Sequence, residues 1–256
     1  MDLKDKVILV TGGASGIGEG CVRVFVEAGA KVVISDRNAA RGQSVLESIT
    51  AAGGTAAFIA TDVTDEAAIK AMVDFAEQKF GGLDGAVNAA GIAGDAATTA
   101  NHTAAEWRLN FEVMLLGVAL SMKYEIPALL KRGGGSIINI ASTGGLGGVP
   151  MMGPYSAAKY GVIGATKSAA LEYAQAGIRV NAICPGLFDT PLFRSKAEEG
   201  MDYSSVVNMV PMGRFGQPSE IGDAALWLLS SRSSYVTGQS IVVDGGLITG
   251  TWSKPE

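Results

Sequence analysis

A glycine-rich loop between an apolar run and an amphipathic segment constrains the fold more than any other part of the sequence. Residues 7–10 are Val-Ile-Leu-Val, an unbroken apolar run typical of a strand buried on both faces. Thr11-Gly12-Gly13-Ala14-Ser15-Gly16-Ile17-Gly18 follows at once, and a helical pattern continues through Glu27. This context directs backbone N–H groups and the positive end of a helix dipole at one point. We therefore expect a phosphate-binding loop of Gly12, Ser15, Gly16, Ile17 and Gly18, although the spacing Gly-x-x-x-Gly-x-Gly is not the commoner Gly-x-Gly-x-x-Gly.

The same alternation of strand and helix continues along the chain. Strand-like runs at 31–35, 55–60, 85–87 and 136–140 alternate with helical patterns at 39–51, 66–80, 103–130 and 156–175. Hydrophobic residues make up 48% of the chain and charged ones 18%, which suffices for a large core. The pattern predicts a single α/β domain over residues 1–256, with one doubly wound parallel sheet of the Rossmann type and helices on both faces.

The carboxyl ends of the strands mark further candidates, because ligands bind there in such sheets. Asp36 ends the second strand, where a carboxylate would accept hydrogen bonds from ribose hydroxyls and repel a 2′-phosphate. Arg37 could attract that phosphate, but Asp36 takes the nearer position, so we expect NAD as the cofactor rather than NADP. Later strand ends would contact the adenine (Asp62, Val63) and the cofactor ribose (Asn88, Ala89, Gly91), although these residues could equally be caps or turns.

Tyr155 and Lys159 are the candidate catalytic pair. They are four residues apart in a helical pattern, so both side chains rise from one face about one turn apart. An ammonium group there favours the phenolate, and we expect it to lower the pKa of Tyr155 from its usual value of about 10. Ser142 follows the run at 136–140, where its hydroxyl could face the same site. A Tyr-x-x-x-Lys pair alone is common in helices without any function, so the assignment of a catalytic role depends on the other motifs of the chain.

Taken together, these motifs resemble the short-chain dehydrogenase/reductase family. They are Thr11-Gly-x-x-x-Gly-x-Gly18, Asn88-Ala-Ala-Gly91, Ser142, Tyr155-x-x-x-Lys159, Asn181-Ala-Ile-Cys-Pro185-Gly186 and Val243-Asp244-Gly245-Gly246. The resemblance implies hydride transfer between nicotinamide and an alcohol or carbonyl. It also implies that Ser142 binds the substrate oxygen, that Tyr155 is the general acid/base, and that Lys159 lowers the pKa of Tyr155 and binds the nicotinamide ribose. The nicotinamide ring would be positioned by Pro185, Gly186, Phe188 and Thr190.

One position departs from the family pattern. The family usually has an asparagine three residues before a glycine in the central helix, where it is thought to hold a water that links the lysine to solvent. Here Met114 precedes Gly117, and a thioether is at best a weak acceptor. Asn110, about 6 Å earlier along the same helix face, could substitute in part. The alternative is that Met114 only fills apolar space.

Residues 188–212 break the strand–helix rhythm and resemble the family's substrate lid. Apolar residues of this region and its surroundings would line the substrate pocket: Leu187, Leu192, Phe193, Met201 and Met209, with Ile92, Leu146, Val149 and Met152. Core packing could use the same residues. If they do line a pocket, the substrate is largely apolar around its reacting carbon.

Charge and composition exclude several classes of protein. The net charge of −5 without a basic run argues against nucleic-acid binding. With no apolar run of about 18 residues, we expect neither a signal peptide nor a membrane span. Cys21 and Cys184 fit buried, reduced thiols and hence the cytoplasm. His102, the only histidine, falls in a polar loop without metal partners, so we expect a surface residue and no metal site.

These observations predict an NAD-dependent dehydrogenase of secondary alcohols, or a reductase of the corresponding ketones, acting on a small to medium, largely apolar substrate. The apolar helices at 103–130 and 156–175 predict a homotetramer, as the corresponding helices pair in the family. One alternative is a 3-oxoacyl-carrier-protein reductase, which should prefer NADPH and carry a basic docking patch. Another is a non-catalytic nucleotide-sensing regulator, for which Met114 is the only support.

Overall fold

A seven-stranded parallel sheet forms the centre of the computed structural model, which describes residues 3–198 and 202–250. The strand order is β3-β2-β1-β4-β5-β6-β7. The strands are β1 (Val7–Thr11), β2 (Lys31–Asp36), β3 (Thr55–Ala60), β4 (Gly85–Asn88), β5 (Gly135–Ile140), β6 (Ile178–Pro185) and β7 (Ser240–Val243). From β1 the chain adds β2 and β3 toward one edge of the sheet, and from β4 onward it adds strands toward the other edge. This reversal between β1 and β4 confirms the predicted doubly wound Rossmann-type fold.

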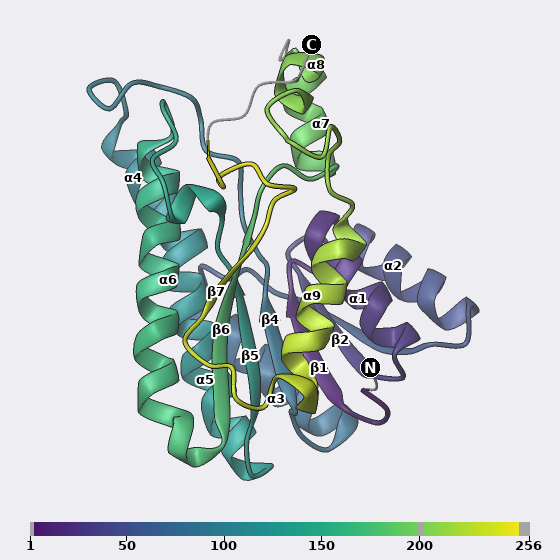
Figure 1. Cartoon of the computed structure of the whole chain (residues 1–256). Helices are drawn as coiled ribbons and strands as arrows, with labels where there is room; N and C mark the ends of the chain where they lie inside the picture. Colours follow the sequence, from purple (N-terminus) through teal and green to yellow (C-terminus); the bar gives the residue numbers. More distant parts are fainter. Residues whose placement is uncertain (1–2, 199–201, 251–256) are drawn as a thin grey trace.

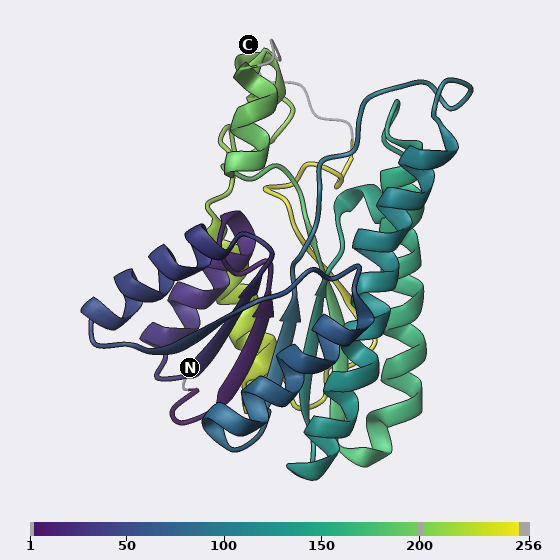
Figure 2. The same cartoon turned by 180° about the vertical axis from the view of Figure 1, so that it is seen from behind.

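Helices cover both faces of the sheet (Figures 1 and 2). One face carries α3 (Glu66–Phe80), α5 (Gly117–Lys131) and α6 (Gly153–Tyr173), and the other carries α1 (Gly16–Glu27), α2 (Ala39–Ala51) and α9 (Pro218–Leu229). Side chains alternate along each strand, so Leu9 packs in the first layer and Ile8 in the second. Both layers are apolar, which explains the unbroken apolar runs of the strands.

Helices α1 and α9 touch through glycines, although they lie near opposite ends of the chain. A Cβ on Gly20 would stand 2.5 Å from the carbonyl carbon of Pro218, and one on Gly222 would stand 2.8 Å from Val24 Cγ2. Real Cβ atoms essentially never approach their neighbours so closely. The helix that follows the glycine loop is therefore held by the last long helix of the chain.

The central helix is continuous but not regular. It comprises α4 (Ala104–Asn110), a π-helical segment η1 (Phe111–Leu116) and α5. The Gly117 N–H donates to the carbonyl of Glu112, five residues back, so the helix is locally widened. By length and composition alone residues 104–131 could cross a membrane, but this is weak evidence, since 56% of the apolar window is buried inside the protein.

Helices α7 (Pro191–Glu198) and α8 (Tyr203–Val207) stand above the carboxyl ends of the strands (Figure 1). They occupy the segment predicted to be a lid. An ion pair between Arg194 and Asp189, 2.7 Å apart, links the start of α7 to the turn before it. Short 3-10 turns complete the described elements: η2 (Thr143–Gly145), η3 (Ala174–Ala176) and η4 (Ser231–Ser233).

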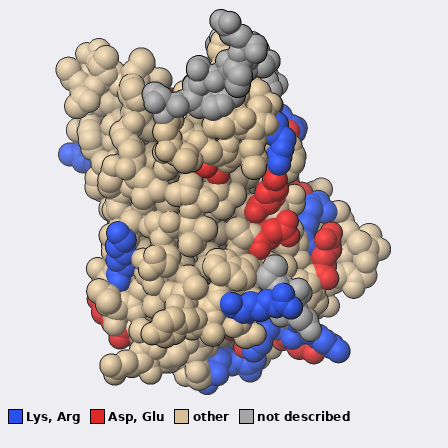
Figure 3. Space-filling view, in the orientation of Figure 1, with Lys and Arg blue, Asp and Glu red and all other residues tan. Residues whose placement is uncertain are grey.

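Charged side chains on the face shown in Figure 3 lie mostly at its lower end and beside α1 and α2, where both signs are mixed. Cys21 and Cys184 are both free and buried, as predicted.

Candidate active site

A cavity of about 1110 Å³ opens at the carboxyl ends of the strands, beneath α7. It brings together residues that the sequence scatters over most of the chain. The predicted site residues that line it are Gly12, Ser15, Gly16, Ile17, Gly18, Asp36, Arg37, Asp62, Val63, Ala89, Gly91, Ser142, Tyr155, Lys159, Pro185, Gly186, Phe188 and Thr190. Asn88 is the one predicted site residue that does not line the cavity.

The glycine loop fits a dinucleotide pyrophosphate. Gly12 has a φ of +67°, and a Cβ there would stand 2.9 Å from the carbonyl oxygen of Ala89. A Cβ on Gly18 would stand 2.1 Å from the carbonyl oxygen of Gly12. Only glycine allows the loop to fold this closely over the start of α1, where free N–H groups and the helix dipole favour an anion.

Asp36 is held in position at the end of β2. Its carboxylate accepts hydrogen bonds from the N–H groups of Ala14 (3.2 Å) and Asn38 (2.9 Å), so it lies directly beside the glycine loop. The carboxylate of Asp62 accepts from the N–H and the hydroxyl of Thr64, at 2.9 and 2.8 Å, and these bonds lower its pKa. Asp62 thus lines the cavity and also closes a turn.

Asn88 does not line the cavity, contrary to the prediction. Its amide nitrogen donates to Glu125 Oε2 and to Asn139 Oδ1, at 3.0 Å each, and Asn139 in turn donates to Thr166 Oγ1 at 2.9 Å. This buried network joins β4 and β5 to α5 and α6 beneath the site. Burial raises the pKa of Glu125 to about 8. Glu125 was not among the residues predicted from the sequence. Helical spacing could have indicated that it is buried, because it places Glu125 on the same face as Val118, Met122 and Leu129.

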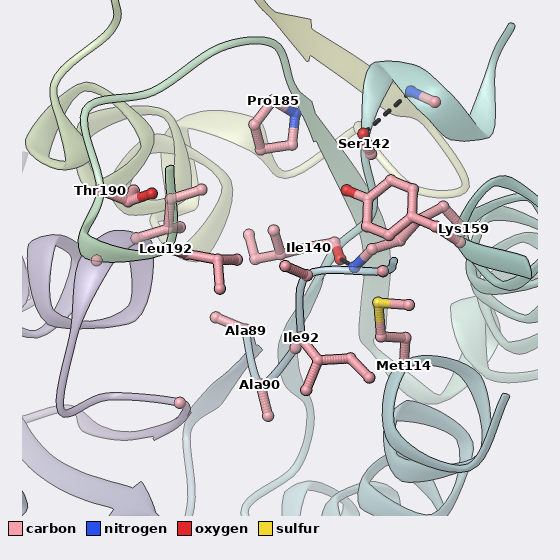
Figure 4. A pocket seen from close by; sticks show the side chains of 18 of the residues that line it. Ala89, Ala90, Ile92, Met114, Ile140, Ser142, Lys159, Pro185, Thr190 and Leu192 are labelled. Atoms are coloured by element: carbon pink, nitrogen blue, oxygen red, sulfur yellow. Dashed lines mark hydrogen bonds between the residues drawn. The ribbon is translucent and has the colours of Figure 1, made fainter. Parts of the chain in front are cut away.

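Ser142, Tyr155 and Lys159 come together from the end of β5 and the first turns of α6. Ser142 Oγ accepts a hydrogen bond from the Gly144 N–H at 3.0 Å (Figure 4). Lys159 Nζ donates to the carbonyl of Ile140 at 2.8 Å and lies 5.8 Å from the centre of the Tyr155 ring. The strand end and the helix face therefore place a hydroxyl, a phenol and an ammonium group in one pocket.

The predicted lowering of the Tyr155 pKa is wrong for this structure. Burial raises the pKa of Tyr155, and the hydrogen bond with Ser142 opposes that rise only in part. Burial also lowers the pKa of Lys159 to about 8, which leaves it mostly charged at neutral pH. Tyr155 is consequently a neutral phenol near pH 7, ready to donate a proton.

Met114 lines the cavity below Lys159 (Figure 4) and packs with Val113 and Ala158. Asn110 does not line it: its amide nitrogen donates to the Glu106 carbonyl at 2.8 Å, and its buried Oδ1 has no partner among the described residues. The π-helical segment begins at Phe111 and includes Met114, so the spacing of residues 110 and 114 no longer gives one face. Packing is the role that these contacts support for Met114.

The substrate half of the cavity is apolar, and most of its predicted residues are there. The predicted residues that line it are Leu187, Leu192, Phe193, Met209, Ile92, Val149 and Met152. Leu146 was predicted wrongly, since it is 39% exposed and does not line the cavity. Met201 lies outside the described residues.

The side chain of His102 is buried, contrary to the prediction of a surface residue. Its side chain is 2% exposed, and its ring packs edge-on against Trp107 with 6.5 Å between the centres. Nε2 lies 3.3 Å from the carbonyl oxygen of Met151. No group of three or more His, Cys, Asp or Glu residues that could hold a metal ion occurs within residues 3–198 and 202–250.

Comparison with known proteins agrees with this geometry. A family model described as enoyl-(acyl carrier protein) reductase, of the short-chain dehydrogenase/reductase type, matches residues 12–248. The chain belongs to the short-chain dehydrogenase/reductase family. The family resemblance drawn from the motifs is thereby confirmed.

Two relatives and one solved structure illustrate the likeness. Cyclohexanol dehydrogenase of Acinetobacter sp. is 44% identical over 241 residues, 94% of each chain. 2,5-dichloro-2,5-cyclohexadiene-1,4-diol dehydrogenase of Sphingobium indicum is 42% identical over 247 residues, 96% of this chain and 98% of the relative. The crystal structure of a single-residue variant of actinorhodin polyketide ketoreductase with NADPH superimposes with a TM-score of 0.92 and 37% identity, covering 96% of this chain and 99% of that one. The protein is an oxidoreductase of this family that interconverts a secondary alcohol and its ketone.

Proposed function

We propose that the protein oxidises small to medium, largely apolar secondary alcohols with NAD, ring alcohols first among them, or reduces the corresponding ketones. The observation that carries the proposal is the apolar half of the cavity beside Ser142 and Tyr155. Ring alcohols are suggested by the names of the two relatives, both of which refer to six-membered rings. A compact apolar ring would bury its surface against Leu187, Val149 and Met152 while its hydroxyl meets the polar pair.

The residues of the site divide the chemistry between them. Ser142 Oγ accepts the Gly144 N–H and its hydroxyl is hydrogen-bonded to Tyr155; with substrate bound, that hydrogen would turn to the substrate oxygen and stabilise negative charge there. Tyr155 exchanges a proton with the same oxygen, as a phenolate in oxidation and as a phenol in reduction. Lys159, fixed by the Ile140 carbonyl, holds a positive charge beside the ring. A bound nicotinamide dinucleotide supplies the hydride acceptor or donor.

The preference for NAD over NADP rests on Asp36. Its carboxylate is fixed by two backbone N–H groups beside the glycine loop, where the adenosine ribose would lie. Unit charges 4 Å apart near a protein surface interact by about 4 kcal/mol before screening, so a 2′-phosphate would be strongly disfavoured. Arg37 and Arg41 also line this end and would oppose part of that repulsion. We infer a net preference for NAD.

The two alternatives have less support. A 3-oxoacyl-carrier-protein reductase needs a basic surface near the cavity for its acidic partner. Arg194 of the lid and Arg214 just after it are instead in ion pairs with Asp189 and Glu220. A regulator without turnover would not need Ser142, Tyr155 and Lys159 in one pocket. Secondary-alcohol turnover remains the function that the site favours.

A homotetramer is proposed from the outer surface of α5 and α6. A groove of about 470 Å³ runs between these helices, lined by Met122, Ile126, Leu130 and Tyr173 among others. Nearby apolar side chains are exposed, including Leu116 at 49% and Leu171 at 84%. A second copy would cover this face by a twofold contact.

A substrate panel tests the function directly. Cyclohexanol, substituted cyclohexanols and open-chain secondary alcohols are supplied with NAD or NADP, and NADH or NADPH absorbance is followed; acetoacetyl-coenzyme A with NADPH represents the acyl alternative. We expect turnover of ring alcohols with NAD, abolished in Tyr155→Phe. Faster reduction of acetoacetyl-coenzyme A than any alcohol oxidation would favour the carrier-protein reductase, and no turnover at all would favour the regulator.

A further inference from the structure

Two loops that wall the substrate half of the cavity meet at a single carbonyl group. Residues 91–94 line the cavity from the loop before α4, and residues 147–150 line it from the loop before α6. Just beyond, the carbonyl oxygen of Met151 accepts a hydrogen bond from the Ala97 N–H at 3.0 Å. Nε2 of His102 lies 3.3 Å from the same oxygen. A carbonyl only accepts, so Nε2 carries a hydrogen and donates it.

The His102 ring is built into this position. Its side chain is 2% exposed, its face is closed by the edge-on contact with Trp107, and Nδ1 lies 3.6 Å from a carboxylate oxygen of Glu106. Trp107 in turn reaches the start of α6, where a Cβ on Gly153 would stand 3.6 Å from its ring. The contact therefore joins α4 to the helix that carries Tyr155.

The backbone at this junction is in an unfavourable conformation that needs support. Met151 has a φ of +64°, in the left-handed region that a residue with a side chain seldom adopts. The two walls also lie close together next to the catalytic tyrosine: a Cβ added to Gly94 would stand 3.5 Å from both Met152 Cε and Tyr155 Cβ. A small rotation at Met151 would thus move Met152 and change the width of the pocket.

We propose that His102 is a positioning residue that sets the size of the substrate pocket by holding the Met151 carbonyl against the opposite loop. It touches neither the reacting atoms nor the dinucleotide half of the cavity. Without its hydrogen bond, the loop at 147–152 moves away from the loop at 91–97. A substrate that fits the closed pocket then binds more weakly, and a bulkier one is admitted. The inference rests on the proposed oxidation of secondary alcohols.

Two substitutions separate the hydrogen bond from the packing of the ring. His102→Phe keeps an aromatic ring against Trp107 but has no donor, whereas His102→Gln keeps an amide donor that can reach the Met151 carbonyl. For cyclohexanol, we expect the Phe variant to raise KM about fivefold, with kcat and the KM for NAD nearly unchanged. Its kcat/KM for a bulky 4-substituted cyclohexanol relative to cyclohexanol should rise. The Gln variant should resemble the wild type in each respect.

Hydrogen–deuterium exchange on the protein without substrate provides a second measurement that does not depend on the reaction. The Ala97 amide should exchange about fivefold faster in His102→Phe and at the wild-type rate in His102→Gln. If the wild type oxidises no alcohol, the proposed function is wrong. The exchange rate of the Ala97 amide still shows whether His102 holds the two loops together. Unchanged exchange and unchanged KM in a folded Phe variant would overturn the inference, as would a Gln variant that behaves like Phe. If the Phe variant does not fold, His102→Asn, with an amide too short to reach Met151, takes its place.

Discussion

Replacing Glu125 with glutamine should change how the stability of the protein depends on pH. Glu125 is fully buried on α5, and burial raises its pKa from 4.5 to about 8, with the hydrogen bond from Asn88 opposing the rise only in part. Between these two values the folded protein keeps a proton that the unfolded chain releases. The stability that this proton contributes is complete below pH 4.5 and is lost progressively as the pH rises to about 8.

The size of the effect follows from the two pKa values. Each pH unit between them lowers the free energy of unfolding by about 1.4 kcal/mol. At pH 7 the loss amounts to roughly 3 kcal/mol, a large share of the 5–15 kcal/mol that is typical of folded proteins. Glutamine has nearly the same shape and stays neutral, so this dependence disappears. The variant should still be less stable than the wild type by an amount that does not depend on pH. Its NH₂ would take the place of Oε1, which has no partner among the described residues, so a buried donor would be left without an acceptor.

The assay is urea unfolding of wild type and Glu125→Gln at several pH values from about 5.5 to 7.5. Over that range, the variant's free energy of unfolding minus that of the wild type should grow by roughly 2–3 kcal/mol. Glu27→Gln, an exposed substitution on α1, is the matched control and should run parallel to the wild type. Parallel curves for wild type and Glu125→Gln would refute the reasoning, because Glu125 would then titrate alike in the folded and unfolded states.

Four further predictions concern activity and assembly. NADP should be used at least about tenfold less efficiently than NAD, a difference of about 1.4 kcal/mol that Asp36→Ala should narrow; equal kcat/KM values in the wild type would contradict this. Because burial raises the pKa of Tyr155, oxidation, which needs the phenolate, should speed up from about pH 6 to 8, whereas reduction, which uses the phenol, should stay nearly constant; a flat oxidation profile would count against this. If proton exchange limits turnover, Met114→Asn should raise kcat with little effect on the KM for NAD. If neither Met114→Asn nor Asn110→Ala changes kcat or the solvent isotope effect, Met114 is only a packing residue. Light scattering should give the mass of a tetramer, and a monomer at micromolar concentration would disprove the assembly.

Features that depend on local patterns were predictable from the sequence. The strands bury both faces, so runs such as residues 7–10 stand out without alternation, and the glycine loop is recognisable because a strand and a helix flank it. Tyr155 and Lys159 follow from helical spacing, since α6 begins at Gly153 and includes both. In each case the residues that determine the structure are neighbours in the chain.

Features that depend on tertiary packing were not. The direction of the Tyr155 pKa is set by burial, which no spacing reveals. Asn88 stands in a strand-end motif, yet its side chain points to Glu125 beneath the sheet because β4 alternates its faces. His102 lies in a polar stretch, but Trp107 and Met151 cover it. The π-helical segment adds a widened turn that a continuous helical pattern does not signal.

The contact between α1 and α9 has a consequence for biosynthesis. The glycine loop and Gly20 are made before Pro218 and Gly222, which hold α1 in place. At typical synthesis rates of about 5–20 residues per second, the two are separated by roughly 10–40 s. Until α9 has been made, α1 lacks the helix that packs against it in the folded protein. A chain that ends before residue 218 should therefore be less stable than the full chain, because α1 would lack this contact.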